Sequence, residues 1–252
     1  MHVPPDHPPI DFLFGINPVF EAIRARRRKI RRAFLNQAQD KHPRLTKLAE
    51  LIQKAGIELV WTDKQELSDR ARTFEHQGAV LECSLYPYLR LDEADDTDPR
   101  CLLIDNIEDP HNLGAILRTA EAFGWKQVFL PMRGVPDVYP SVIKASAGAA
   151  EYLHIVRSAS ENKYAKWAQE KGYKLLALDM AGKVSLDDYA PAADEKIMLV
   201  VGGEDKSVGQ FILNAADAVV KIPQTGRISS LNASVSAAIA IHTLSRRVPT
   251  VG

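Results

Sequence analysis

Apolar residues follow two recurring patterns along this chain. Short runs of strand length end in polar or glycine-containing segments, and longer stretches carry apolar residues at helical spacing. The strands expected from the short runs cover residues 57–61, 79–83, 101–104, 197–201 and 218–222, with a further apolar stretch at 33–35. The helices expected from the longer stretches cover 17–27, 45–55, 112–123 and 231–244, with a short helix after Asp63. This alternation predicts an α/β fold.

Two domains are expected, because residues 85–99 interrupt the pattern. This segment contains Pro87, Pro99 and an acidic run, a composition typical of an extended linker that packs little core. The predicted organisation is a small α/β domain at 11–84, a linker at 85–99 and a larger domain at 100–252.

Three polar segments of the larger domain are expected to meet at one edge of its sheet. They span residues 105–124, 201–204 and 222–239, and each follows an apolar run of strand length. Open α/β sheets bind ligands at the carboxyl ends of their strands. The sequence therefore predicts one site built from three distant loops.

Residues of these segments also have plain structural explanations. Arg118 lies six residues after Asn112, about 9 Å along a helix, and would serve as an ordinary surface arginine. The two glycines at 202 and 203 suit a strand-to-helix turn. Side chains near helix starts would satisfy free backbone amides. The candidates for such caps are Asn112, Ser229, Ser230 and Asn232.

In their order and spacing, the three segments resemble the motifs of the SpoU (TrmH-like) family of RNA ribose 2′-O-methyltransferases. The matching residues read Asn112-Leu-Gly-Ala-Ile-Leu-Arg118, Val201-Gly-Gly-Glu204, and Ile222-Pro with Ser230-Leu-Asn232. The resemblance covers the larger domain. It implies a knotted SPOUT fold with a mostly parallel sheet, S-adenosylmethionine as the methyl donor, and a ribose 2′-hydroxyl of RNA as the acceptor.

The resemblance also implies which residues form the site. The cofactor contacts carried over from the family are Gly202, Ile222 and Leu231, and the reaction-site residues are Asn112, Arg118, Glu204, Ser230 and Asn232. Because a guanidinium stays protonated in proteins, Arg118 is expected to bind the adjacent phosphate and to stabilise developing alkoxide charge. Asn112, Ser230 and Asn232 would orient the ribose. Glu204 would hold Arg118 or Asn112 in place.

The chain departs from the family pattern at three positions. Gln224 stands where methionine is frequent, and Ala233 and Ser236 stand where valine and alanine are common. The polar side chain of Gln224 changes one expected wall of the adenine pocket.

The implied reaction needs no metal. A sulfonium methyl group is already activated, so the protein has to align the reacting atoms and assist loss of the hydroxyl proton. The seven histidines are scattered without the spacing of a ligand cluster.

The smaller domain carries a basic run and two further motifs. Phe14-Gly-Ile-Asn-Pro-Val19 and His76-Gln-Gly78 resemble the ribosomal-protein-like RNA-binding domain of one branch of the family, the bacterial large-subunit ribosomal RNA guanosine methyltransferases. A turn leading into a strand explains His76 better than a catalytic base does. Seven cations lie within residues 24–32, and by themselves they suit a solvated helix end as well as an RNA contact. Beside the motifs that resemble the methyltransferase family, RNA contact is the favoured interpretation. The residues expected to contact RNA are Arg26, Arg27, Arg28 and Lys29.

Composition limits the remaining classes. The chain has 252 residues, is 46% hydrophobic and has a formal net charge of zero, so it can bury a core and its overall charge does not indicate a nucleic-acid partner. No apolar run is long enough for a membrane span, and residues 1–11 do not resemble a signal sequence. Two cysteines, Cys83 and Cys101, suit a reducing cytoplasm as small apolar fillers.

Alternatives remain for the partner and the activity. Large-subunit ribosomal RNA is the preferred substrate because of the smaller domain, and transfer RNA is second. A non-catalytic RNA-binding assembly factor on the same fold is a different class, against which the retained polar residues argue. A nicotinamide dehydrogenase lacks its Gly-x-Gly-x-x-Gly fingerprint here. A homodimer is expected from the family and from the apolar helix at 231–244.

Overall fold

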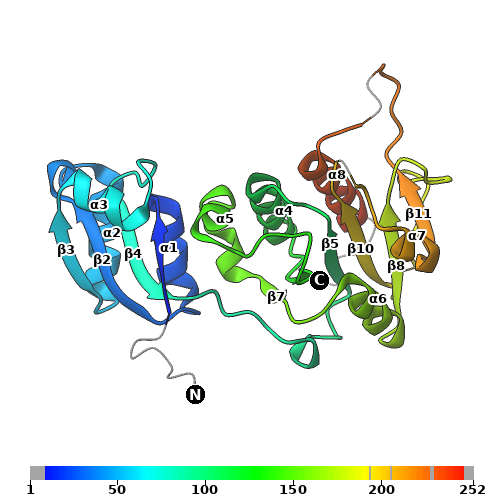
Figure 1. The fold of residues 1–252 in the computed structure, drawn as a ribbon, viewed down its shortest axis with the longest axis horizontal. Coiled ribbons are helices and arrows are strands. Elements are labelled where there is room, and N and C mark those ends of the chain that lie inside the picture. Colours follow the sequence, from blue (N-terminus) through cyan, green and yellow to red (C-terminus); the bar gives the residue numbers. More distant parts are fainter. Residues whose placement is uncertain (1–8, 193, 205, 228–229, 247–252) are drawn as a thin grey trace. The chain divides into compact units, whose positions relative to one another are not determined.

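The computed structural model describes residues 9–192, 194–204, 206–227 and 230–246. The chain forms two compact units, and each is described separately (Figure 1). One unit comprises the chain up to residue 87 together with residues 138–151, and the other comprises residues 88–137 and 152–252. Residues 138–151 therefore pack with the amino-terminal unit, although the sequence pattern placed them in the domain at 100–252.

The amino-terminal unit is a four-stranded sheet with helices on both faces. Its strands are β1 (Ile10–Phe14), β2 (Ile30–Asn36), β3 (Glu58–Thr62) and β4 (Ala79–Ser84), in the order β1-β4-β2-β3. Only β2 and β3 pair in parallel. Its helices are α1 (Ile16–Ala25), α2 (Pro43–Lys54), α3 (Lys64–Ala71) and, from the later segment, α5 (Pro140–Ala145). The expected helices and strands of this unit are confirmed, and β1 is an additional strand that the pattern did not predict.

The second unit is a seven-stranded parallel sheet. Its strands are β5 (Arg100–Asp105), β6 (Gln127–Phe129), β7 (His154–Val156), β8 (Tyr173–Leu178), β9 (Val184–Ser185), β10 (Lys196–Gly202) and β11 (Ala218–Lys221), in the order β7-β6-β5-β10-β8-β11-β9. Its helices are α4 (Pro110–Ala122), α6 (Glu161–Glu170), α7 (Gln210–Ala215) and α8 (Ala233–Arg246). The predicted α/β fold with a mostly parallel sheet is confirmed.

Both faces of the central strands are buried. On β5, Cys101 and Leu103 join a core cluster with Tyr164 and Trp167 of α6, while the alternate residue Leu102 is equally inaccessible on the other side. Helix α4 packs on α8, which in turn contacts β10 (Figure 1). This two-sided burial explains why the strands are continuous apolar runs rather than alternating ones.

The boundary between the two units, after residue 87, lies within the segment predicted as a linker, and residues of segment 85–99 also pack in the two cores. Tyr86 is 6% exposed, and its hydroxyl donates to Ala150 O at 2.7 Å within the amino-terminal unit. In the second unit, Leu89 forms a parallel bridge with Val156, and Leu91 packs against the main core cluster. The apolar residues between the prolines and acids are therefore anchors rather than linker.

The ends of α4 match the sequence pattern only in part. Gly124, at φ 75°, ends the helix as predicted, because its N–H and that of Trp125 bond to the last turn. Phe123 was expected in the buried stripe, but it is 42% exposed and its ring meets that of His242 edge-on at 5.5 Å.

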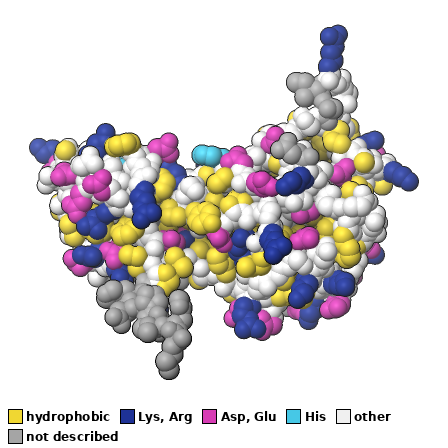
Figure 2. Space-filling model, viewed as in Figure 1, with side chains coloured by type: hydrophobic (Ala, Val, Ile, Leu, Met, Phe, Trp, Pro, Cys, Tyr) yellow, Lys and Arg dark blue, Asp and Glu magenta, His cyan; other side chains and the backbone are white. Residues whose placement is uncertain are grey.

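The surface of the chain carries both charges. Basic and acidic side chains are interspersed over the visible face in Figure 2, in agreement with the net charge of zero. Among the described residues, no helix is long and apolar enough to cross a bilayer.

The turn at His76 is held by the buried imidazole ring. His76 is 2% exposed; its Nδ1 accepts a hydrogen bond from Gly78 N at 3.0 Å, and its Nε2 lies 3.2 Å from Ser68 Oγ. Because Nδ1 accepts, the folded state favours the neutral ring. This geometry agrees with a structural turn and explains the His-Gln-Gly sequence locally.

His76 is expected to make the protein less stable in acid. Burial lowers the pKa of His76, and the charges of Lys64 and Lys144 lower it further. The unfolded chain therefore takes up the proton first as the pH falls below about 6.5, and stability decreases from that pH downward. Urea unfolding measures the free energy of unfolding at pH 7.5 and at pH 5.5. Between these two pH values, His76→Asn should lose less of this free energy than the wild type. His42 is exposed, so His42→Asn is the matched control. If His76→Asn lost as much free energy of unfolding on acidification as the wild type, the role assigned to His76 would be contradicted.

Candidate active site

The three polar segments of the sequence do meet at one edge of the parallel sheet. Strands β5 and β10 are neighbours, with Gly202 in register with Asp105, and β11 lies beyond β8 on the same side. Since all these strands run in parallel, their carboxyl ends share one edge. Side chains from positions more than a hundred residues apart therefore come within hydrogen-bond distance.

A polar cluster of Asn112, Glu204 and Asn232 forms the centre of this edge. Glu204 Oε1 accepts hydrogen bonds from Asn232 Nδ2 at 2.7 Å and from Asn112 Nδ2 at 3.2 Å. Asn232 Nδ2 also lies 2.9 Å from Asn112 Oδ1. One residue from each of the three sequence segments takes part. Glu204 therefore contacts Asn112, one of the two residues that it was expected to hold in place.

Neighbouring residues cap the two helices and leave Asn112 available for the cluster. Asp109, rather than Asn112, caps α4, because its Oδ1 accepts from His111 N at 2.9 Å. For α8 the cap is Asn232, whose Oδ1 accepts from Ser234 N at 3.0 Å and from Val235 N at 3.3 Å. The amide of Asn232 thus caps the helix with its oxygen and contacts Glu204 with its nitrogen. Ser230 does not cap α8, and Ser229 lies outside the described residues.

A hollow with largely apolar walls adjoins the polar cluster. All three residues expected to contact the cofactor line it, namely Gly202, Ile222 and Leu231. Leu178, Met180 and Val201 add further apolar surface, and Glu204 and Ser230 add polar groups. Apolar walls with a few convergent polar groups suit a flat, amphipathic ring such as adenine. The residues present therefore fit the nucleoside part of S-adenosylmethionine.

The glycines at the end of β10 are required by the backbone itself. A Cβ on Gly202 would overlap the backbone of Ser207, and a Cβ on Gly203 would overlap the carbonyl of Asn106. Ser207 Oγ donates a hydrogen bond to Asp179 at the end of β8. The turn after β10 is thus packed against its neighbours in a way that no larger residue permits.

Gln224, the polar departure from the family pattern, lies in the wall of this hollow. Its Nε2 is 3.2 Å from the sulfur of Met180, which also lines the hollow. The amide therefore contacts a neighbouring side chain in the place of the expected methionine.

A second, more polar hollow of about 360 Å³ shares Glu204 with the first. Asn106, Asn112 and Lys206 line it. Lys206 Nζ bonds to Glu108 Oε1 at 2.7 Å, and this contact lowers the pKa of Glu108. The sequence motifs did not indicate Lys206, because a lysine after Gly-Gly-Glu has no distinctive spacing. Its location beside the cluster makes it a candidate contact for an anionic substrate.

Arg118 is exposed on α4 and lines neither hollow. It forms no ion pair within the described part of the chain. The proposed contact between Glu204 and Arg118 is absent there, and Glu204 bonds to the two asparagines instead.

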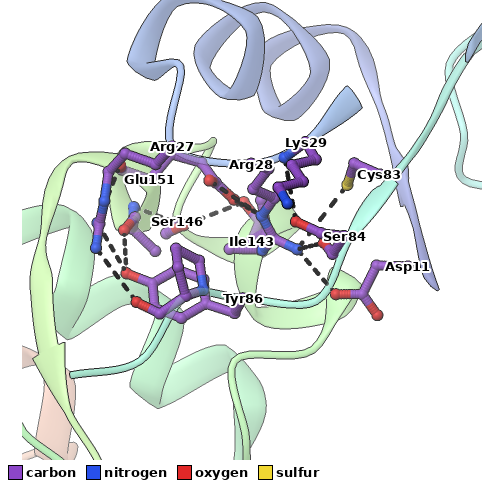
Figure 3. Close-up of polar contacts among 12 residues, drawn as sticks. Asp11, Arg27, Arg28, Lys29, Cys83, Ser84, Tyr86, Ile143, Ser146 and Glu151 are labelled. Carbon is purple, nitrogen blue, oxygen red and sulfur yellow. Dashed lines mark hydrogen bonds and ion pairs between the residues drawn. The ribbon is translucent and has the colours of Figure 1, made fainter. Parts of the chain in front are cut away.

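Arg28 is not available to RNA, which corrects one of the expected contacts. Its side chain is fully buried: Nε bonds to Glu151 Oε1 at 2.9 Å and Nη1 to Asp11 Oδ2 at 2.8 Å (Figure 3). Arg27 bonds to Tyr86 Oη at 3.4 Å and to the carbonyl of Glu151 at 3.3 Å. Arg28, at the centre of the basic run, thus binds a buried carboxylate of a distant segment. The local sequence does not reveal this contact.

The remaining members of the run differ in their surroundings. Arg24 pairs with Glu21, and both Arg31 and Arg32 pair with Glu82. Arg26 and Lys29 are exposed. The RNA contact predicted for this run therefore depends on Arg26 and Lys29 more than on its centre.

An open parallel α/β sheet with an apolar hollow and a polar cluster at its carboxyl edge is an arrangement typical of an α/β enzyme that binds a nucleoside-containing ligand. Residues 99–242 match the SpoU rRNA Methylase family, and residues 12–89 match the family described as RNA 2′-O ribose methyltransferase substrate binding. The chain belongs to the SpoU rRNA methylase family, whose members are RNA methyltransferases that use S-adenosylmethionine.

Relatives and solved structures agree with this membership. YacO of Bacillus subtilis, assigned to the TrmH family of tRNA/rRNA methyltransferases, is 31% identical over 96% of this chain and 98% of its own length. The AdoMet-bound rRNA methyltransferase from Sinorhizobium meliloti superposes with a TM-score of 0.78 at 22% identity, covering 94% of this chain and 87% of its own. The AviRb methyltransferase of Streptomyces viridochromogenes in complex with AdoMet gives 0.77 at 21% identity, covering 94% and 90%. These structures share the fold; the knot stays a prediction.

Proposed function

We propose that this enzyme transfers the methyl group of S-adenosylmethionine to a ribose 2′-hydroxyl of structured RNA, with large-subunit ribosomal RNA as the preferred substrate and transfer RNA as the second candidate. The observation that supports this most directly is the cluster of Asn112, Glu204 and Asn232 beside the apolar hollow. The match of residues 12–89 to a substrate-binding family supports RNA as the partner.

The apolar hollow and the polar cluster would hold different groups of the two substrates. Gly202, Ile222 and Leu231 would hold the nucleoside of the cofactor, which supplies an activated methyl group when bound. The amide groups of Asn112 and Asn232 would orient the ribose hydroxyl, and Glu204 keeps both amides in place by accepting a hydrogen bond from each. Ser230, exposed in the cofactor hollow, would contact the sugar from the other side.

Arg118 would supply positive charge rather than a base. An exposed guanidinium without an ion pair in the described region suits a phosphate oxygen next to the methylated ribose. The same charge would stabilise the alkoxide that develops as the hydroxyl loses its proton. Arg26 and Lys29 would bind more distant phosphates through the amino-terminal unit.

Methyl transfer is tested with tritiated S-adenosylmethionine and with ribosomal or transfer RNA from a strain lacking the enzyme. A 2′-O-methyl group blocks alkaline cleavage at its own linkage, so the label should appear in alkali-resistant dinucleotides. Label in mononucleotides would instead indicate base methylation. RNA binding without any transfer would indicate the non-catalytic assembly factor.

Glu204→Ala is expected to lower the rate of methyl transfer by about a hundredfold. Without the carboxylate, Asn112 and Asn232 lose their shared partner, and displacement of positioning groups by about 1 Å costs about that factor. Glu108→Ala is the matched control, because Glu108 lines the same polar hollow but pairs with Lys206 and contacts neither asparagine among the described residues. Equal rates for the two variants would contradict the role of Glu204.

We also propose that the enzyme is a homodimer. On α8, Val235 is 46% exposed, and Phe123, directly after the adjacent helix α4, is 42% exposed. Both would be covered if these helices met a second copy. Sedimentation at equilibrium should give about twice the chain mass of 27.9 kDa, and the monomer mass would refute the proposal.

A further inference from the structure

A cavity of about 620 Å³ lies at the same edge of the parallel sheet, beyond the polar hollow. Its walls come from the ends of β5 and β6 and from the starts of α6 and α7. Asn106 lines both this cavity and the polar hollow, so the two are neighbours. The proposed reaction uses none of the other residues in this cavity.

The lining of the cavity is rich in hydrogen-bond acceptors. Asp105 is 5% exposed, and its carboxylate accepts a single hydrogen bond among the described residues, from Gly209 N to Oδ2 at 2.8 Å. Asn162 Oδ1 is buried and has no hydrogen-bond partner among the residues that the structure describes. Burial raises the pKa of Asp105, the Gly209 N–H lowers it, and the nearby charge of Glu161 raises it again. Buried acceptors without partners carry a desolvation cost that a ligand with N–H donors would remove.

Two apolar side chains of the cavity are unusually accessible. Met132 is 56% exposed and Phe211 is 44% exposed, and both line the cavity. Aromatic and thioether groups are the surfaces on which flat rings stack in proteins that bind single-stranded RNA. Arg133, also in the lining, is exposed and forms no ion pair within the described segments.

The cavity is formed in advance of any ligand. The side chain of Arg157, 7% exposed, donates to Pro131 O at 2.8 Å and to Val135 O at 3.2 Å, and it pairs with Asp137 at 2.8 Å. These bonds fix the loop that carries Met132. A binding site with fixed walls loses less entropy on binding than a flexible one.

We propose that this cavity binds an amino-bearing nucleobase of the RNA substrate, with Asp105 and Asn162 accepting hydrogen bonds from the base and Phe211 stacking on its face. The proposal rests on the function proposed above, because the shared wall at Asn106 places this base near the ribose that is methylated. Arg133 binds the phosphate of the same nucleotide.

The acceptor-rich lining decides which base fits. Guanine presents an amino group and a ring N–H as donors, and cytosine presents an amino group. Asp105 and Asn162 accept hydrogen bonds from these donors. Uracil carries a carbonyl where cytosine carries its amino group. Hypoxanthine carries a hydrogen where guanine carries its amino group. A phosphate is disfavoured in the part of the cavity lined by Asp105 and Glu161, because both side chains are acidic.

Nuclear magnetic resonance on the ¹⁵N-labelled full chain tests this site with free nucleotides. The cofactor hollow is first saturated with S-adenosylhomocysteine, so that shifts report on the second cavity. The amide signals of Gly209, Asn106 and the side chain of Asn162 are then followed during titration with GMP or IMP, and with CMP or UMP.

The expected result is that GMP binds about tenfold more tightly than IMP, or CMP about tenfold more tightly than UMP. Asp105→Asn retains an acceptor for Gly209 N but should abolish this preference. Phe211→Ala should weaken binding of the preferred nucleotide by about fivefold or more. The exposed Val184 gives the matched control, and Val184→Ala should leave binding unchanged. Absence of any preference in both pairs, or shifts confined to the cofactor hollow, would overturn the proposal.

Methyl transfer by the same variants separates an RNA base from a free nucleotide. If the base belongs to the substrate, Asp105→Asn should raise the KM for RNA while the affinity for S-adenosylhomocysteine stays the same. An unchanged KM would overturn the assignment to RNA. Should the wild type transfer no methyl group while GMP or CMP still binds selectively, the proposed function would fail and the base site would stand.

Discussion

Glu151→Ala is expected to lower the free energy of unfolding by about 3–5 kcal/mol. The substitution removes the carboxylate that receives Arg28 Nε at 2.9 and 3.1 Å, while both side chains are fully buried (Figure 3). Asp11 and the carbonyl of Ser84 would remain as partners on one side of the guanidinium. The Nη2 atom of Arg28 already has no hydrogen-bond partner within the described part of the chain, so the charge would be poorly compensated. Urea unfolding followed by circular dichroism measures the loss.

The titration of the pair agrees with a charged Arg28 at every accessible pH. Burial lowers the pKa of Arg28, but the attraction of Glu151 and the hydrogen bonds that Arg28 donates to Glu151 and Asp11 leave it raised. Burial raises the pKa of Glu151, against the opposing effect of Arg28. Burial also raises the pKa of the adjacent Cys83 thiol to about 12, so that this cysteine stays neutral as an apolar filler.

Two further variants separate the buried pair from ordinary surface charge. Arg24→Ala breaks an exposed pair with Glu21 and should cost about 0–1 kcal/mol. The double variant Arg28→Met with Glu151→Leu replaces the pair with apolar groups and should recover most of the stability lost in Glu151→Ala. A loss below about 1 kcal/mol in Glu151→Ala would show that solvent reaches Arg28.

Arg118→Ala is expected to reduce methyl transfer by about 10²–10³-fold while leaving cofactor affinity intact. Removal of one group that stabilises developing negative charge has an effect of this size. The cofactor hollow is lined by residues of other segments, so its affinity should not change. The rate is measured with tritiated S-adenosylmethionine at saturating RNA, and affinity by isothermal titration with S-adenosylhomocysteine.

A matched arginine and a conservative variant complete this test. Arg90 of the same unit is exposed and pairs with Asp92, and Arg90→Ala should leave the rate within twofold. Arg118→Lys keeps the charge but loses the planar fork that binds a phosphate through two bonds, so it should recover only part of the rate. Normal turnover in Arg118→Ala would refute the assignment.

The local sequence pattern was sufficient to predict a strand or a helix end wherever the residues of that segment alone set its environment. The strands at 101–104 and 197–201 are buried on both faces, and their continuous apolar runs reflect that burial directly. Gly124 ends α4 because a positive φ favours glycine in any context. Capping was harder to predict, because Asp109, Asn112, Ser230 and Asn232 are all good caps and only the hydrogen bonds distinguish them.

The sequence by itself determined the α/β class, the family and the three loops that form the site, because these depend on spacing along the chain. Only the tertiary structure decided which polar side chains pair: Glu204 bonds to Asn112 and Asn232, and Glu151 removes Arg28 from the surface. Hydrogen bonds and buried ion pairs depend on atoms a few ångströms apart, and a linear pattern does not encode contacts between residues 28 and 151. The same reason explains why the cavity beside Asp105 became visible only in three dimensions.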